Sequence, residues 1–206
     1  MENFDRIELF GYPGSGKTTS LNVIHKRHFA FNLKKSNVAF TLKNSFSLIG
    51  YIIRNPKAFS LFTWLRYVPF SRYKNYLNTI IRFLLRIQAV EKDIQSNDRY
   101  IVDEGVLQIT WSLLLLPAIY NRSFEINKKL AYLQNNWWPD VNILVYHLKV
   151  SDEEYIQRIK SRVRMHFFSN AFLNNDERVV HIGKHLSDTI IEHVIANCNN
   201  IIIRRV

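Results

Sequence analysis

Short apolar runs alternate with longer segments of helical periodicity along the chain. The runs are rich in β-branched and aromatic residues, which is typical of buried strands. Five segments have this character: Arg6–Phe10, Val38–Leu42, Tyr100–Asp103, Val141–Val150 and Asn200–Arg204. Strands that alternate with helices predict an α/β fold, a three-layer α/β/α sandwich in which helices cover both faces of a parallel five-stranded sheet.

The segments between the strands have the apolar spacing of helices. Helices are expected over Lys17–His28, most of Ser45–Gln95, Val106–Leu116 and Phe124–Leu133. In the second of these, apolar residues between Leu77 and Ile87 recur at i, i+3, i+4 and i+7. This spacing places Arg82 and Arg86 on the opposite face of the helix.

Two serines are expected to start the helices of the C-terminal part. Ser151 and Glu154 have the spacing of a capping box, in which each side chain satisfies a backbone amide of the first helical turn. Ser187 is expected to cap a last helix that ends near Ala196.

The composition indicates one globular domain over residues 1–206, because no repeat, low-complexity tract or linker interrupts the chain. Hydrophobic residues make up 47%, which excludes a disordered chain. The single cysteine, Cys198, cannot form an internal disulfide, and the N-terminus lacks a signal-peptide pattern. The most apolar run, Gly105–Asn121, is too short and too polar for a membrane span. We therefore expect a cytoplasmic protein.

The positive charge is unevenly distributed along the sequence. The formal net charge is +11, and residues 9–90 contain thirteen Lys or Arg and no Asp or Glu. Such asymmetry predicts a positive field over one part of the molecule, which attracts anionic ligands.

The segment GYPGSGKT, Gly11 to Thr18, matches the G-x-x-x-x-G-K-[ST] pattern in full. Its glycines allow backbone amides to turn toward a phosphate, and the following helix points its positive end at the same place. Lys17 is expected to reach the β- and γ-phosphates, and the Thr18 hydroxyl to bind magnesium. The pattern predicts ATP with Mg²⁺, although GTP is not distinguished. The expected nucleotide contacts are Gly11, Pro13, Gly14, Ser15, Gly16, Lys17, Thr18 and Thr19.

Two carboxylates end the predicted strand at Tyr100–Asp103. In phosphate-loop proteins an acid at the end of a neighbouring strand holds magnesium, and Asp103 fits that role. Glu104 is a candidate general base, because residues 9–90 supply no other carboxylate. The alternative is that both acids are a solvated strand end.

The segment Ser151–Arg164 is amphipathic and carries arginines. Arg158 and Arg162 lie one turn apart, where they could clamp a triphosphate and balance the charge of phosphoryl transfer. The alternative is an exposed helix with a Glu154–Arg158 pair at i,i+4 spacing.

Three segments, GYPGSGKTT, YIVDEG and NILVYHLKVSDEEYIQRIKSRVR, occur in the order found in phosphate-loop (P-loop) kinases. The chain resembles the group of nucleoside monophosphate, thymidylate and deoxynucleoside kinases. The resemblance implies a P-loop NTPase fold of the nucleotide-kinase type, a helical acceptor-binding region at 44–97 and a lid-like region at 151–183.

The resemblance also implies roles for single positions. Arg158, Arg162 and Arg164 are lid candidates, and the adenine contact should come from a loop around Arg178–Lys184. Deoxynucleoside kinases usually have a Glu at the end of the second strand, where this chain reads Leu42-Lys43-Asn44. Thymidylate kinases usually have Asp-Arg in place of Asp103-Glu104.

The segment Leu61–Lys74 interleaves aromatic and basic residues. It could receive a phosphorylated sugar, stack single-stranded nucleic acid bases or lie against an anionic membrane surface. The alternative is that Leu61, Phe62, Trp64, Leu65 and Val68 are helical core with solvated cations outside.

These features favour a kinase that moves the γ-phosphoryl of Mg-ATP to an anionic small-molecule acceptor, namely a nucleotide, a nucleoside, a sugar or a sugar phosphate. Its catalytic residues would be Lys17, Asp103, Glu104, Arg158 and Arg162. The alternative is an NTP-hydrolysing switch whose basic lobe binds nucleic acid, a membrane surface or a protein. A homodimer is compatible with either function.

Overall fold

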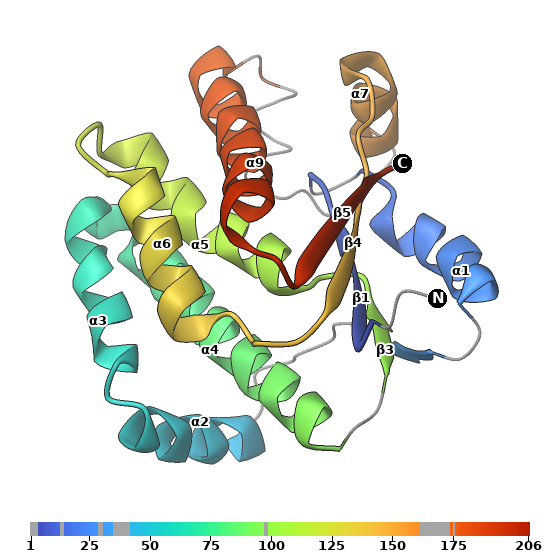
Figure 1. Ribbon diagram of the computed structural model, residues 1–206. Coiled ribbons are helices and arrows are strands. Elements are labelled where there is room, and N and C mark those ends of the chain that lie inside the picture. Colours follow the sequence, from blue (N-terminus) through green and yellow to red (C-terminus); the bar gives the residue numbers. More distant parts are fainter. Residues whose placement is uncertain are drawn as a thin grey trace.

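The computed structural model describes residues 4–12, 15–28, 31–34, 42–96, 99–160, 174 and 176–206. Its sheet has five strands in the order β2-β3-β1-β4-β5, and every neighbouring pair is parallel (Figure 1). The strands are β1 (Arg6–Phe10), β2 (Asn32–Lys34), β3 (Tyr100–Val102), β4 (Ile143–His147) and β5 (Ile201–Arg205). The predicted α/β class and parallel sheet are confirmed.

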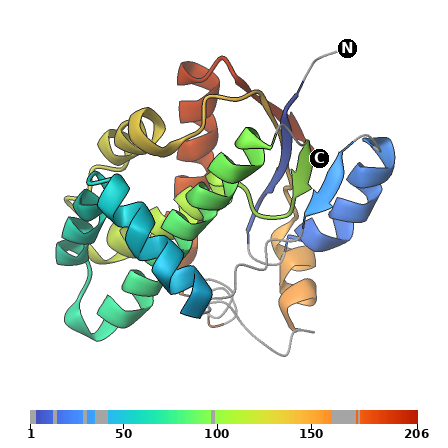
Figure 2. The same cartoon turned by 90° about the horizontal axis from the view of Figure 1, so that it is seen from below.

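The helices lie on both faces of this sheet. They are α1 (Lys17–Arg27), α2 (Leu42–Arg54), α3 (Ala58–Phe62), α4 (Tyr73–Gln95), α5 (Val106–Tyr120), α6 (Ile126–Trp137), α7 (Asp152–Lys160) and α9 (Glu177–Asn197), with 3-10 turns η1 (Thr63–Tyr67) and η2 (Phe70–Arg72). Figure 2 shows α1 on one side of the sheet and α4, α5 and α9 on the other. Among the described helices, none is long and apolar enough to cross a membrane.

Alternation along the strands builds two hydrophobic clusters. Leu9 and Leu144 pack with Leu21 of α1, whereas Phe10 and Val145 belong to the cluster that contains α4, α5 and α9. Successive strand residues point to opposite faces, so one strand serves both clusters. Helix α5 is apolar around its whole circumference because β1, α4 and α9 all pack against it.

The second strand differs from the prediction. It is β2 at Asn32–Lys34, which pairs with β3, while Leu42 of the predicted strand begins α2. Residues 38–41 lie outside the described part of the chain. Strand β2 is at the edge of the sheet, where polar residues such as the exposed Asn32 are tolerated, so its sequence lacks the apolar run of a central strand.

The predicted start of the last helix was also wrong, whereas its predicted end near Ala196 agrees with α9, which ends at Asn197. Helix α9 begins at Glu177, and Asp176 caps it by accepting a hydrogen bond from the Val179 amide at 3.2 Å. Ser187 lies buried in the middle of α9, because the apolar stripe continues past it on both sides. The segment Arg178–Lys184, expected to be a loop, forms the first turns of this helix.

The start of α7 agrees with the predicted cap. The Ser151 hydroxyl accepts a hydrogen bond from the Glu154 amide at 3.2 Å, and the helix begins at Asp152. This cap fixes the direction in which α7 leaves the carboxyl end of β4.

Candidate functional site

The predicted phosphate loop connects β1 to α1 at the carboxyl end of the sheet. Gly16 immediately precedes α1 and has a φ of 89°, a left-handed conformation that glycine adopts without a steric penalty. A Cβ atom on Gly11 would lie 2.6 Å from Ser15 Oγ and 2.8 Å from the Leu148 carbonyl oxygen. Both glycines are therefore required by the backbone. Pro13 and Gly14 lie outside the described residues.

Lys17 lies across this loop. Its Nζ donates hydrogen bonds to the carbonyl oxygens of Gly11 at 2.7 Å and Tyr12 at 2.9 Å. Thr18 and Thr19 are exposed in the first turn of α1. Ser15 is fully buried, and its Oγ has no hydrogen-bond partner within the described part of the protein. A buried donor of this kind, beside a lysine and a helix N-terminus, fits a phosphate oxygen.

Arg158 of α7 contacts the phosphate loop. Its Nη1 donates to the Ser15 carbonyl oxygen at 2.5 Å, and a Cβ atom on Gly16 would collide with the guanidinium group. Arg158 also pairs with Glu154, one turn earlier in α7. Arg158 therefore makes both the i,i+4 pair with Glu154 and the contact with the phosphate loop. Arg162 and Arg164 lie outside the described residues.

Aromatic packing also connects α7 to the loop. The rings of Tyr12 and Tyr155 meet edge to face with centroids 6.1 Å apart. Burial, together with the nearby carboxylates of Asp188 and Asp152, raises the pKa of the Tyr12 hydroxyl. Tyr12 is therefore a neutral packing residue that holds the start of the loop against α7.

The two predicted acids follow β3, the strand next to β1. Glu8 of β1 is in register with Val102 of β3, so Asp103 and Glu104 leave the sheet at its carboxyl edge beside the phosphate loop. Asp103 is half-buried and Glu104 is exposed. The structure thus brings Lys17, Thr18, Asp103 and Glu104 to the same edge.

Glu8 of β1 was not predicted from the sequence as a residue of this site. This residue is 1% exposed, and its Oε1 accepts a hydrogen bond from Arg6 Nε at 2.7 Å. Its Oε2 accepts a hydrogen bond from the Val106 amide, the first residue of α5, also at 2.7 Å. A second contact of Arg6, from Nη1 to Asp93 Oδ2 at 3.2 Å, holds the pair to α4. The only signal in the sequence is a charged pair within an otherwise apolar strand.

The periodicity of α4 placed Arg86 on the face opposite the apolar residues. In the structure Arg86 is nevertheless buried, with 5% of its surface exposed. Burial lowers the pKa of its guanidinium, while the carboxylates of Glu104, Asp103 and Glu8 act in the opposite direction. A charged group is retained in the interior when opposite charges face it. These acids are brought together by β1 and the end of β3, so the helical periodicity of α4 alone could not reveal them.

His147 ends β4 on the other side of β1. Its ring lies 5.4 Å from the Phe10 ring, centroid to centroid, and its Nδ1 is buried without a hydrogen-bond partner in the described structure. Burial lowers the pKa of His147 to about 4. The imidazole is therefore neutral near pH 7.

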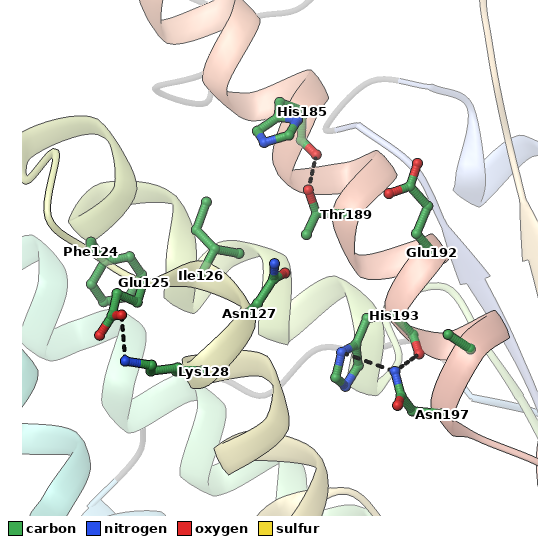
Figure 3. Close-up of a pocket in the computed structure, with 11 residues that line it drawn as sticks. Phe124, Glu125, Ile126, Asn127, Lys128, His185, Thr189, Glu192, His193 and Asn197 are labelled. Atoms are coloured by element: carbon green, nitrogen blue, oxygen red, sulfur yellow. Dashed lines mark hydrogen bonds and ion pairs between the residues drawn. The ribbon is translucent and has the colours of Figure 1, made fainter.

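A separate open groove of about 830 Å³ lies between α6 and α9 (Figure 3). His185, Glu192 and His193 of α9 line one side of it, and Glu125 and Lys128 the other. None of its lining residues belongs to the phosphate loop, the end of β3 or α7. This groove is thus distinct from the predicted nucleotide site.

No protein-family model matches the chain, and no curated protein matches its sequence. Solved structures similar to it include three of deoxyadenosine kinase from M. mycoides. The one with bound dATP has a TM-score of 0.56 at 16% identity, covering 97% of this chain and 90% of that one. The one with the products dCMP and a flexible dCDP has a TM-score of 0.56 at 17% identity, covering 98% and 89%.

The third structure, with bound dCTP, has a TM-score of 0.50 at 17% identity and covers 97% of this chain and 89% of that chain. Identities this low show a common fold only. Almost the whole length of both chains is nevertheless matched. In this chain α7 contacts the phosphate loop, because the strand order places β4 next to β1. The chain has the fold of the P-loop kinases.

Proposed function

We propose that the protein is a kinase that transfers the γ-phosphoryl group of Mg-ATP to an anionic small-molecule acceptor. The observation that carries this proposal is the contact between Arg158 and the Ser15 carbonyl, across 143 residues of sequence. It places a guanidinium group from the segment after β4 directly over the predicted phosphate loop. A cation in that place can balance the negative charge that shifts during phosphoryl transfer.

Binding of the triphosphate is assigned to the loop Gly11–Thr18. Lys17 would exchange its two carbonyl contacts for the β- and γ-phosphates, and the unpartnered Ser15 hydroxyl could donate to a phosphate oxygen. The close approach at Gly11 keeps the loop narrow. Thr19 and the positive end of α1 complete the cradle.

Thr18 and Asp103 are proposed to hold magnesium. A hydroxyl and a carboxylate are the hard oxygen donors that Mg²⁺ prefers, and such sites usually take their remaining ligands from phosphate and water. Among the described residues no group of three or more His, Cys, Asp or Glu could hold a metal ion, so a cage made only of such side chains does not occur there. The metal would neutralise phosphate charge and orient the triphosphate.

Glu104 is proposed as the base that accepts the proton of the acceptor group. It is exposed at the end of β3, next to Asp103. The end of β2 offers no alternative, because β2 ends at Lys34 and residues 9–90 contain no acid. The usual carboxylate of deoxynucleoside kinases at that strand end is therefore missing. Basic residues in its place favour an acceptor that already carries negative charge.

The acceptor class can be tested by measuring ADP release from ATP by the purified protein. The reaction is run with and without magnesium, alone and with separate pools of nucleosides, nucleotides, sugars and sugar phosphates. Nucleosides and nucleotides come first because the similar structures hold dATP, dCTP or dCMP. ADP release that needs both magnesium and one anionic pool is the expected result.

Slow ADP release that is indifferent to every pool would contradict the kinase assignment. If a macromolecule then stimulated the hydrolysis, the protein would be an NTP-hydrolysing switch. The Lys17→Ala variant is the control in each case, because any activity that survives this change does not come from the proposed site.

A further inference from the structure

The basic and aromatic segment Leu61–Lys74 is divided by the fold into two parts. Leu61, Trp64 and Val68 are buried and belong to the hydrophobic core. These three residues agree with the alternative that the apolar positions of the segment are core. Phe62, Leu65 and Tyr67 are partly buried and pack against this core, whereas Arg66, Phe70 and Lys74 are exposed and are not explained by core packing.

Apolar side chains reach the surface where η2 leads into α4. Phe70 is 86% exposed, the highest value among the large hydrophobic residues of the described chain, and its ring contacts Tyr73 at 5.2 Å. Leu77, 36% exposed, lies one helical turn beyond Tyr73 on α4. We refer to Phe70, Tyr73 and Leu77, with the exposed cations Arg66 and Lys74, as the Phe70 patch.

The charge around this patch is positive. Arg66 lies over the Tyr67 ring at 4.8 Å, and Lys129 of α6 lies 5.5 Å from the same ring. Lys74 follows Tyr73 in the first turn of α4. No Asp or Glu occurs between residues 9 and 90, so the segment itself provides no neutralising carboxylate. An anionic partner is thus favoured.

We propose that the Phe70 patch docks the protein on an anionic lipid surface. Exposed apolar side chains together with the exposed cations Arg66 and Lys74 suit the interface of a bilayer, where the apolar side chains enter the acyl boundary and the cations meet the lipid headgroups. The proposal is independent of the proposed kinase activity.

The geometry favours lipid over single-stranded nucleic acid. The rings of Phe70 and Tyr73 are inclined at 58° to one another, so they cannot both stack on successive bases. The aliphatic side chain of Leu77 offers no stacking surface at all. All of them can be buried in an acyl layer.

The test is co-sedimentation of the full chain with vesicles of two compositions. One set contains phosphatidylcholine alone, and the other contains phosphatidylcholine mixed with phosphatidylglycerol. We expect binding to the anionic vesicles only, weakened by salt because the lipid charge is screened. The Phe70→Ser variant and the Arg66→Gln, Lys74→Gln double variant should each bind at least about tenfold more weakly.

Matched substitutions elsewhere serve as controls. Ile195→Ser removes another exposed apolar side chain, 65% exposed, from α9, and Lys26→Gln with Arg27→Gln removes two exposed charges from α1. Both should bind like the unchanged protein. Circular dichroism shows whether each variant is folded, and Phe70→Ser should be, since the side chain is almost fully solvated.

Three outcomes would overturn the proposal: no binding to anionic vesicles, equal binding to both vesicle types, or equal loss in the patch and control variants. A single-stranded oligonucleotide is tested in parallel. If it bound and Phe70→Ser abolished that binding while vesicles were ignored, the patch would be a nucleic-acid surface instead.

Discussion

The carboxylate of Glu8 in β1 accepts a hydrogen bond from the amide of Val106 at 2.7 Å, which joins the central strand to the first turn of α5. Asp103 and Glu104 lie in the short connection that this bond closes. The proposed metal ligand and base are thus positioned from the centre of the sheet, by a residue that need not contact a substrate itself.

Replacement of Glu8 by Ala should strongly destabilise the fold. Arg6 would lose its closest partner in the interior, and the Val106 amide would lose its acceptor. Breaking a buried ion pair on one side costs about 3–5 kcal/mol in the free energy of unfolding. Chemical denaturation measures this loss. Glu192→Ala, at an exposed position of α9, should change stability by less than about 0.5 kcal/mol, and a similar small value for Glu8→Ala would contradict the network.

Gly105→Ala should be equally informative. A Cβ atom at Gly105 would overlap the Glu8 carboxylate, so the turn before α5 must shift. We expect a loss of about 1–3 kcal/mol and reduced kinase activity. The matched change is Gly50→Ala, where a Cβ atom meets only the end of Arg54 at 3.6 Å inside α2. This change should stabilise by up to about 1 kcal/mol, and equal effects at the two glycines would refute the steric argument.

Lys17→Ala should separate chemistry from folding. Lys17 is only partly buried and bonds to loop carbonyls, so thermal stability should change little. If the side chain neutralises the β- and γ-phosphates, kcat should fall by about two orders of magnitude or more. Turnover and melting temperature are measured on the same preparation. A melting temperature of Lys17→Ala well below that of the unchanged protein would show that Lys17 has a structural role in place of a catalytic one.

Arg158→Lys should be nearly as inactive as Arg158→Ala, because a single ammonium group cannot reproduce a guanidinium that reaches both the loop and Glu154. We expect about a hundredfold loss in kcat with little change in stability. Glu154→Gln is the control, because it removes only the exposed pair, which contributes about 0.3–0.5 kcal/mol. If kcat fell as much in Glu154→Gln as in Arg158→Ala, the relevant contact of Arg158 would be its pair with Glu154 within α7.

Acid should destabilise the fold partly through His147. Burial and the charges of Lys149 and Arg205 lower its pKa to about 4 from an ordinary value of 6.5, while Asp188 opposes them. The unfolded chain therefore binds a proton that the folded chain excludes. This contribution is complete above pH ~6.5 and is lost as the pH falls toward ~4, with an upper limit of the order of 3 kcal/mol.

Denaturation of the unchanged protein and of His147→Gln between pH 7 and pH ~4 isolates this effect. The variant should lose less stability over that range. His185→Gln, at an exposed position of α9, should follow the unchanged protein. Parallel curves for all three proteins would show that His147 is solvated.

Local patterns in the sequence were sufficient for several parts of the molecule. The predicted phosphate loop, Gly11 to Thr18, consists of consecutive residues. Its G-x-x-x-x-G-K-[ST] pattern is therefore visible in the sequence without any tertiary contact. The central strand β4 has an apolar run, and β1 is apolar apart from the pair Arg6 and Glu8, because both faces of these strands are buried. In contrast, the edge strand β2 has no such run, and it was misplaced for that reason.

The tertiary structure decided which charged side chains are buried and which apolar ones are exposed. Arg86 and Glu8 are distant in sequence, and their burial becomes favourable only when the folded chain brings the opposite charges of α4, β1 and the end of β3 together. Arg158 reaches the loop only because β4 lies next to β1. Phe70 had the same hydrophobic signature as Trp64, yet one is exposed and the other buried. Periodicity reports the faces of a single element, whereas the partner of each face depends on contacts that close only when the whole chain has folded.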